Sequence, residues 1–197
     1  MPKISEERKT ERREQILAGA RRCFARHGYE GATVVRLEEE TGLSRGAIFN
    51  YFESKEELFL ELAWRDNERL VRLWLEKGWE AALREIAAED PEWLGVYLEI
   101  ARKLRTDPDF RREHETRTAE QLAPELVEHV RAQQDAGVLR ADRPPEQLAG
   151  FIGLVANGVV VQLATGEPIR NMDALVALVD SAVRDSDPAR RPSRRRA

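Results

Sequence analysis

Apolar residues recur along most of the chain at the three- and four-residue spacing of a helix face. Near the start, this spacing relates Ile16, Leu17, Ala20, Phe24 and Ala25, and such a stripe predicts an amphipathic helix. No segment alternates apolar and polar positions with the period of two that a half-buried strand requires. The pattern therefore predicts an all-α fold.

Glycine, proline and capping residues divide this helical pattern into about nine helices. Glycines at 28, 42 and 78 supply the permissive backbone that ends a helix, and Ser54 with Glu57 forms a capping box. Pro124 predicts a kink or a break in the segment 109–135. In the helix expected over 34–40, Val35 and Leu37 are both expected to point inward. The expected helices span approximately residues 10–27, 34–40, 44–52, 55–76, 80–90, 93–107, 109–135, 146–166 and 171–185.

Charge is distributed unevenly along the 197 residues, although the formal net charge is only −4. Residues 1–55 carry 11 Lys and Arg against 9 Asp and Glu, whereas residues 56–185 carry 16 against 26. Phosphate attraction is local and screened by salt. An acidic body with a mildly basic first segment is therefore compatible with nucleic-acid contact through that segment only.

Several other classes of protein are not expected. No stretch approaches the roughly 18–20 consecutive apolar residues of a membrane span, and the first residues are charged where a signal peptide is apolar, so we expect a cytoplasmic protein with no membrane partner. Cys23 is the single cysteine and is expected to be a buried structural thiol. The chain contains no glycine-rich phosphate loop and no hydrolase motif, and none of its three histidines lies in a recognisable catalytic setting. No enzyme is therefore expected.

The segment from 34 to 52 combines a short helix, a turn at 41–43 and a second short helix, an arrangement typical of a helix-turn-helix. At 100° per residue the second helix divides into two faces. One face carries Ala47, Ile48, Tyr51 and Phe52, and the other carries Arg45, Gly46, Phe49 and Asn50. The first set is suited to packing and the second to reading DNA in the major groove.

Each residue of the second set has a role that its chemistry suggests. Arg45 can donate to guanine and Asn50 can pair with adenine, while Gly46 lets the backbone approach the duplex and Phe49 meets a thymine methyl or a sugar. Phosphates can be contacted by Thr33, Ser44, Tyr51 and Lys55. An alternative is also compatible with the periodicity: Thr33 and Ser44 are ordinary caps, Arg45 is solvated and Phe49 belongs to the core.

Three phrases resemble the DNA-binding domain of the TetR family of repressors: "FARHGYEGATV", "TGLSRGAIFNYF" and "SKEELF". The resemblance implies an all-α homodimer with a three-helix helix-turn-helix domain at 1–54, which binds a double-stranded DNA operator. It also implies a helical domain at 55–185 that dimerises and holds a small-molecule effector. The remaining residues, 186–197, are expected to form a disordered basic tail. The tail arginines could add non-specific DNA affinity, and a solubilising role is the alternative.

Within that family, "GARRCFA", "KLRTDP" and "LATG" resemble the aconitase repressors of actinobacteria, although this chain has Asn50 and Tyr51 where that branch tends to have histidines. The likeness implies citrate with a divalent cation such as Mg²⁺ as effector, matched by His129 and Asp180, and no required cofactor. Other effector candidates are Trp93, Glu99, Arg102, Gln121 and Asn157. Each of these could instead be an ordinary core or surface residue.

The last two helices are apolar on more than one side and are expected to form the homodimer, helped by small residues at 150, 153, 156 and 158. Packing within one subunit is the alternative. We expect DNA to favour reading heads about 34 Å apart and the effector to favour another state, with helix 55–76 tilting between the two. Alternative functions are control of a transport or efflux gene by a hydrophobic ligand, and a non-catalytic helical adaptor for proteins.

Overall fold

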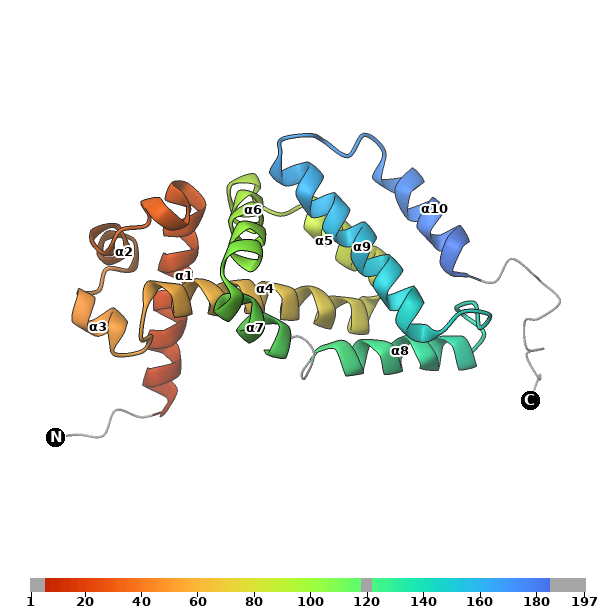
Figure 1. Cartoon of the computed structure of the whole chain (residues 1–197), viewed down its shortest axis with the longest axis horizontal. Coiled ribbons are helices and arrows are strands. Elements are labelled where there is room, and N and C mark those ends of the chain that lie inside the picture. The colour runs from red at the N-terminus through yellow and green to blue at the C-terminus, as the bar shows by residue number, and fades with distance from the viewer. Residues whose placement is uncertain (1–5, 118–121, 185–197) are drawn as a thin grey trace. The chain divides into compact units, whose positions relative to one another are not determined.

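The computed structural model describes residues 6–117 and 122–184, and these residues form ten α-helices and no strand (Figure 1). The predicted basic tail and Gln121 lie outside the described residues. The all-α prediction is confirmed. The helices are α1 Glu6–Gly31, α2 Val34–Thr41, α3 Arg45–Phe49, α4 Lys55–Lys77, α5 Trp79–Ala87, α6 Pro91–Thr106, α7 Pro108–Arg117, α8 Ala123–Asp135, α9 Pro145–Ala164 and α10 Met172–Val183.

Glycine and proline end the helices where the sequence predicts. Gly42 has φ 69° as the cap of α2, and Gly78 has φ 92° between α4 and α5. Gly28 has φ 66° and ψ 178°, which breaks α1 before its last turn. The segment with Pro124 contributes two helices to the described residues, α7 and α8, with Pro124 in the first turn of α8, and this is why ten helices are described rather than nine.

Two local predictions need correction. The helix expected over 44–52 is shorter, because α3 ends at Phe49 and Asn50 follows as its cap. Val35 does not point inward, since its side chain is 61% exposed while Leu37 is fully buried. Residues two apart on a helix are about 200° apart around its axis, so one buried face of α2 cannot hold both.

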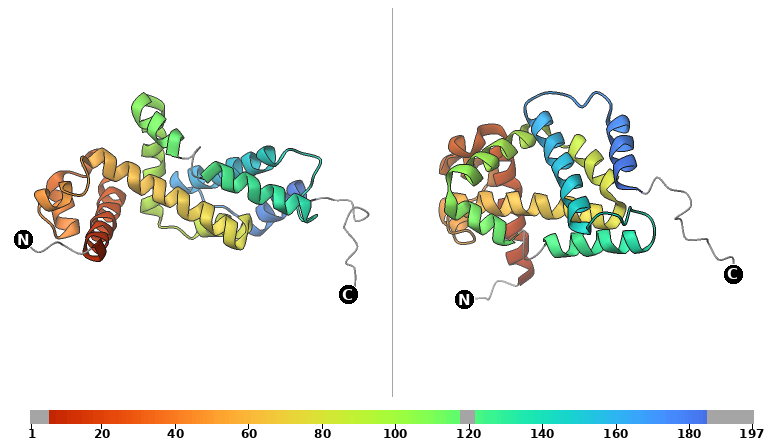
Figure 2. Two further views of the ribbon diagram at one scale, coloured as in Figure 1. Left: turned by 90° about the horizontal axis from the view of Figure 1, so that it is seen from below. Right: turned by 45° about the vertical axis from the view of Figure 1, so that its right-hand side comes forward.

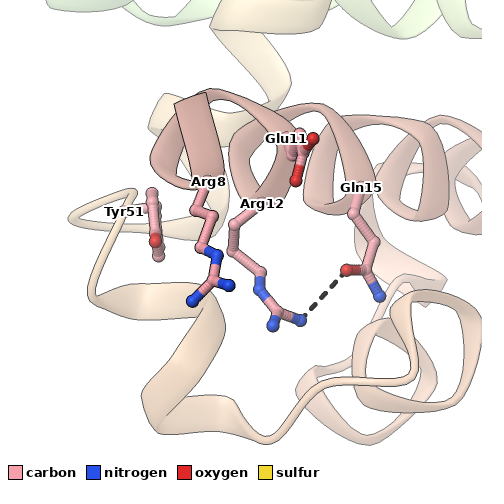
Figure 3. A pocket seen from close by; sticks show the side chains of 5 residues that line it. All are labelled: Arg8, Glu11, Arg12, Gln15 and Tyr51. Carbon is pink, nitrogen blue, oxygen red and sulfur yellow. Dashed lines mark hydrogen bonds between the residues drawn. The ribbon is translucent and has the colours of Figure 1, made fainter. Parts of the chain in front are cut away.

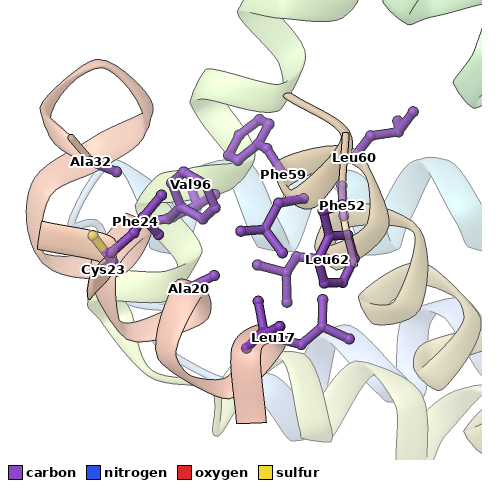
Figure 4. Close-up of a cluster of buried hydrophobic side chains, with 14 of the residues drawn as sticks. Leu17, Ala20, Cys23, Phe24, Ala32, Phe52, Phe59, Leu60, Leu62 and Val96 are labelled. Atoms are coloured by element: carbon purple, nitrogen blue, oxygen red, sulfur yellow. The ribbon is translucent and has the colours of Figure 1, made fainter. Parts of the chain in front are cut away.

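The chain falls into two compact units. The first unit comprises residues up to 67, 89–114 and 164–166. Its core gathers side chains from α1, α4 and α6, among them Phe24, Phe59 and Val96 (Figure 4). The rings of Phe24 and Phe59 meet edge to face with centroids 5.1 Å apart. Cys23 is buried in this core as predicted, and burial raises the pKa of its thiol, which makes it a poor nucleophile.

Within the first unit, both α6 and α2 pack against α1 (Figures 1 and 2). A Cβ added at Gly19 would lie 2.7 Å from the Cα of Thr41. The backbones of α1 and α2 therefore approach as closely as glycine allows, which fixes the helix-turn-helix on α1.

The second unit comprises residues 68–88, 115–163 and 167 onward. Ion pairs join α5 to α10 at both ends: Arg84 with Asp173 at 2.6 Å, and Arg184 with Glu80 at 3.1 Å. The backbone N–H of Arg140 donates to the carbonyl of Val183 at 2.8 Å, and this bond ties the loop before α9 to the last turn of α10.

Helix α9 is more apolar than a count of consecutive apolar residues suggests. It is 20 residues long and contains an 18-residue window with a mean hydropathy of 1.6, so length and composition alone would let it cross a membrane. A buried core helix meets the same criterion, and one such helix is weak evidence.

Candidate nucleic-acid interface

The turn between α2 and α3 is held by side chains that satisfy free backbone groups. The hydroxyl of Thr41 donates to the carbonyl of Leu37 at 2.7 Å and accepts from the N–H of Leu43 at 3.2 Å. Across the turn, a carboxylate oxygen of Glu38 accepts from the N–H of Arg45 at 2.6 Å. The start of α3 is thus anchored to α2, and its direction is fixed before any DNA is present.

Thr33 and Ser44 are helix N-caps. The Thr33 hydroxyl accepts from the N–H of Arg36, and the Ser44 hydroxyl accepts from the N–H of Ala47, each at 3.4 Å. Both residues are exposed, and a hydroxyl that accepts from the backbone still has its own proton to donate. The capping role therefore leaves both hydroxyls able to contact a phosphate.

The predicted reading residues Arg45, Gly46 and Asn50 are all exposed at α3. None of the ion pairs found within residues 6–117 and 122–184 involves Arg45. A Cβ at Gly46 would meet nothing within 4 Å, so the protein itself does not require glycine there. Ile48 and Phe52 are buried as expected and hold α3 to the module.

Phe49 and Lys55 are more engaged with the protein than their predicted roles require. Phe49 is half-buried and packs against the core. The ammonium group of Lys55 donates to the carbonyl of Tyr29 at 2.7 Å and lies 4.3 Å from the centre of the Tyr29 ring. The hydroxyl of Ser54 accepts from the N–H of Glu57 at 3.0 Å, so the predicted cap of α4 is present.

A cavity of about 420 Å³ lies beside this module and was not foreseen from the sequence. It is lined by Arg8, Glu11, Arg12, Gln15 and Tyr51 (Figure 3). Tyr51 is the one lining residue that was predicted to contact DNA. The available signal was the spacing of residues 8, 12 and 15, which puts three polar side chains on one face of α1.

Three of the predicted effector residues lie on α6 and take part in its contact with the rest of the first unit. The indole N–H of Trp93 donates to Asp66 at 2.7 Å, and the Trp93 side chain is only 1% exposed. The same carboxylate of Asp66 accepts from Arg21 at 2.9 Å and from the hydroxyl of Tyr97. Asp66 is buried, so these donors compensate its charge.

Glu99 and Arg102 bind the C-terminal part of α1. The carboxylate of Glu99 accepts from the N–H of Tyr29, next to the break at Gly28. Arg102 pairs with Glu30 at 3.4 Å. Next to Arg102, Lys103 pairs with Glu56. Burial lowers the pKa of Lys103, but the hydrogen bonds that it donates to Glu56 and Asp107, together with the charges nearby, outweigh burial and raise its pKa. The charged groups of this side of α6 are therefore committed to contacts within the protein.

Three further effector candidates with described positions lie in the second unit, and no contact among the described residues brings them together. His129 on α8 is half-buried and Asn157 on α9 is exposed. Asp180 on α10 pairs with Arg184. Among residues 6–117 and 122–184, no group of three His, Cys, Asp or Glu side chains is placed to hold a metal ion.

Comparison with known proteins agrees with this geometry. Residues 16–62 match the family described as bacterial regulatory proteins, tetR family. The chain is 46% identical over 188 residues to the HTH-type transcriptional repressor Rv1474c of Mycobacterium tuberculosis, covering 94% of this chain and 100% of that protein. It is 42% identical over 194 residues to the HTH-type transcriptional repressor AcnR of Corynebacterium diphtheriae, covering 96% and 100%.

Among solved structures, Salmonella enterica GusR superposes with a TM-score of 0.72 at 21% identity, covering 92% of this chain and 96% of that one, and this likeness concerns the fold. The relatives at 42–46% identity span nearly the whole chain and are named HTH-type transcriptional repressors, and the tetR family match covers residues 16–62 of this chain. The chain therefore belongs to the TetR family of bacterial transcriptional regulators, which are non-enzymatic DNA-binding proteins.

Proposed function

We propose that this protein is a cytoplasmic repressor that binds a palindromic operator as a homodimer and leaves it when a small-molecule effector binds. The observation that carries the DNA-binding role is the exposed surface of α3, with Arg45 and Gly46 at its start and Asn50 as its C-cap. Glu38 and Ser44 hold the start of this helix in place. Preorganised exposed donors next to open backbone are what base reading in the major groove requires. The printed names of the relatives support repression.

In this proposal Arg45 and Asn50 read base edges, while Gly46 lets the backbone of α3 come close to the duplex. Thr33 and Ser44 donate their hydroxyl protons to phosphates from the N-termini of α2 and α3. Phe49 contributes its exposed edge to a thymine methyl or a sugar. Lys55 can add phosphate affinity only by giving up its bond to the carbonyl of Tyr29.

The homodimer is proposed to form through α9 and α10. Phe151, Leu154 and Val161 on α9 are exposed apolar residues on one stripe, with Gly158 between them. A Cβ at Gly158 would meet nothing within 4 Å, so a partner helix can approach closely there. Leu178 on α10 is also exposed. An exposed apolar stripe of this kind favours burial against a second copy.

Citrate with Mg²⁺ is the effector we propose to test first, because the relatives include named AcnR repressors. Since Asp180 is paired with Arg184, a cation there would require that pair to open. For a ligand bound within the first unit, the structure offers a different candidate contact, separate from Asp180. Within the described residues, the indole nitrogen Nε1 of Trp64 on α4 is buried without a hydrogen-bond acceptor. A carboxylate or hydroxyl of the effector would satisfy it.

The test is selection of bound duplexes from a randomised pool, followed by fluorescence anisotropy on the selected sequence. We expect a palindrome whose half-sites are centred about one DNA turn apart, roughly 34 Å. Citrate with Mg²⁺ should then weaken operator binding relative to sodium chloride of equal ionic strength. Failure to enrich any sequence would overturn the repressor proposal, and unchanged affinity with citrate would remove citrate as the effector.

A further inference from the structure

The cavity beside α3 has an arrangement of charge that packing does not explain. Four of its five lining residues come from the first part of α1, and Tyr51 comes from the segment after α3. Arg8, Arg12 and Gln15 extend from the same side of α1 towards this space (Figure 3). All four α1 residues are exposed, so the cavity opens to solvent.

Arg12 differs from most arginines of α1. Arg13, Arg21, Arg22 and Arg26 each pair with a carboxylate at 2.6–3.2 Å. In the parts of the chain that the structure describes, no ion pair includes Arg12, and its observed partner is the neutral amide of Gln15 at 3.0 Å. Its positive charge is therefore not neutralised by a hydrogen-bonded carboxylate, although Glu11 also lines the cavity.

The spacing of the two lining arginines is a second indication that the cavity suits an anion. Arg8 and Arg12 are four residues apart on one face, and like charges at this spacing disfavour a helix. A bound anion would attract both guanidinium groups and thereby offset their mutual repulsion. Two guanidinium forks with a neighbouring phenol hydroxyl form a donor set that suits the oxygens of a phosphate diester.

Gln15 connects this donor set to the helix-turn-helix. Its amide nitrogen donates to the carbonyl of Thr41 at 2.9 Å, and its amide oxygen accepts from Arg12 at 3.0 Å. Thr41 is the last residue of α2, and its hydroxyl holds the turn that leads into α3. The position of the Arg12 guanidinium is thereby set relative to the reading helix.

We infer that this cavity is a phosphate site that holds the DNA backbone beside the bases read by α3, with Arg8, Arg12 and Tyr51 as donors and Gln15 as a positioning residue. The inference rests on the proposed DNA-binding function and adds a contact from α1 to it. A backbone phosphate is the source of the anion because the site opens next to α3, where the duplex is proposed to lie. Such a contact sets register and affinity but reads no sequence.

The experiment compares full-length variants by fluorescence anisotropy on the selected operator and on a random duplex, at several potassium chloride concentrations. Arg12→Ala and Arg8→Ala should each weaken binding to both duplexes by roughly tenfold, and should reduce the slope of log K against log salt by about 1. Arg112→Ala on α7 removes the same charge from an exposed residue outside the cavity, and it should leave affinity and slope unchanged.

A positioning role for Gln15 makes a separate prediction. Gln15→Ala keeps both arginines, so the salt slope should stay as in the parent while operator affinity falls by roughly threefold. Arg12→Lys should likewise keep the slope without restoring full affinity, because an ammonium group lacks the fork. Thermal unfolding of the same proteins checks that neither change acts through folding.

The outcomes separate the two proposals. If the parent protein binds no duplex, the proposed function fails. If the parent binds, Arg45→Ala weakens operator binding, but Arg8→Ala and Arg12→Ala behave like Arg112→Ala, then only the phosphate site is refuted. Saturable binding of inorganic phosphate or citrate that is lost in Arg12→Ala, with DNA binding unchanged, would also overturn it by assigning the cavity to a free anion.

Discussion

Gly46 is the residue at which the demands of folding and of DNA binding differ most clearly. It lies inside α3, where glycine costs about 0.5–1 kcal/mol relative to alanine, yet no neighbouring atom would contact an added methyl group. Gly46→Ala should therefore raise the free energy of unfolding by up to about that amount, as measured by urea titration. Operator binding should nevertheless weaken, because the methyl group would stand between the helix and the duplex.

The matched control for this substitution is Gly95→Ala on α6, where an added methyl group also meets nothing within 4 Å. It should give a similar gain in stability with operator affinity unchanged, because the position lies outside both α3 and the proposed dimer helices. Operator affinity equal to that of the parent in Gly46→Ala would show that the duplex does not approach α3 at this residue.

Trp64 and Trp93 can be compared because they differ in whether the indole N–H has a hydrogen-bond acceptor. The indole N–H of Trp64 is buried and finds no acceptor among the residues that the structure describes, whereas that of Trp93 donates to Asp66 at 2.7 Å. Leaving a buried donor unpaired costs about 1–3 kcal/mol. We expect Trp93→Phe to lower the free energy of unfolding by roughly that amount and Trp64→Phe to leave it unchanged or raise it.

The same two proteins test the proposed effector contact. If citrate with Mg²⁺ accepts a hydrogen bond from Trp64, its stabilising effect in a thermal unfolding assay should shrink in Trp64→Phe. Clear destabilisation of the ligand-free Trp64→Phe protein would mean that the indole N–H already has a partner, and it would remove the argument for a ligand at that place.

Single residues also mark the limit of sequence reasoning here. The caps at Thr33 and Ser44 and the buried side chains of Ile48 and Phe52 were predictable, because each depends on neighbours within a few positions. Arg8 and Arg12 were not singled out, since an exposed arginine on an amphipathic helix looks the same whether or not a carboxylate faces it. Only the packed structure reveals that, among the described residues, Arg12 pairs with no carboxylate.

Among the helices, α6 shows most clearly why polar residues in an apolar helix have no single meaning in the sequence. Trp93, Glu99 and Arg102 stand out in the sequence as polar or amphipathic residues within an apolar helix, which is equally compatible with a ligand pocket and with an interface between helices. Their partners are far away along the chain: 27 residues separate Trp93 from Asp66, and 70 separate Glu99 from Tyr29. No local pattern encodes a pairing over that distance, whereas helix ends are encoded by adjacent glycine and proline.

Asp66 joins three helices, since it lies on α4 and accepts from Arg21 on α1 and from Trp93 and Tyr97 on α6. Removing one partner of a buried charged cluster typically costs about 3–5 kcal/mol. Arg21 is partly exposed, so we expect the lower end, about 3 kcal/mol, for Asp66→Ala in urea unfolding. The deletion leaves a cation and two neutral donors without their acceptor.

Asp109→Ala provides the comparison, because Asp109 is an exposed carboxylate paired with Arg112 on one helix. A surface pair of this kind contributes less than about 0.5 kcal/mol. If Asp66→Ala were equally mild, the contact of α6 with α1 would have to depend on the apolar core alone, and the polar cluster would be dispensable for it.

At the scale of the whole molecule, the apolar character of α9 and α10 exceeds what folding of one chain uses. On α9, Leu148, Ile152 and Val159 are buried, while Phe151, Leu154 and Val161 on the opposite stripe are exposed. Periodicity showed that these helices are apolar on more than one side, and this is now confirmed. It could not show whether the second face meets another part of the chain or a second copy, because both use the same residues.

The exposed stripe yields a prediction about assembly. Leu154 is 72% and Leu178 is 68% exposed, so replacing either by glutamate should cost the folded subunit little. Burial of an unpaired carboxylate in an interface is strongly unfavourable, so Leu154→Glu and Leu178→Glu should each sediment as monomers where the parent is a dimer. Operator affinity should fall when the dimer is lost. A single reading head holds only one half-site and lacks the effective concentration that a linked second head supplies.

Leu98→Glu on α6 introduces the same charge at another exposed leucine, outside α9 and α10. It should remain dimeric and bind the operator as the parent does, which separates an effect on the interface from the general effect of an added carboxylate. Dimers that persist in both Leu154→Glu and Leu178→Glu, with circular dichroism unchanged, would place the interface elsewhere on the molecule. In that case the two-fold axis relating the reading heads would have to be sought on another surface, and the half-site spacing would be the measurement that locates it.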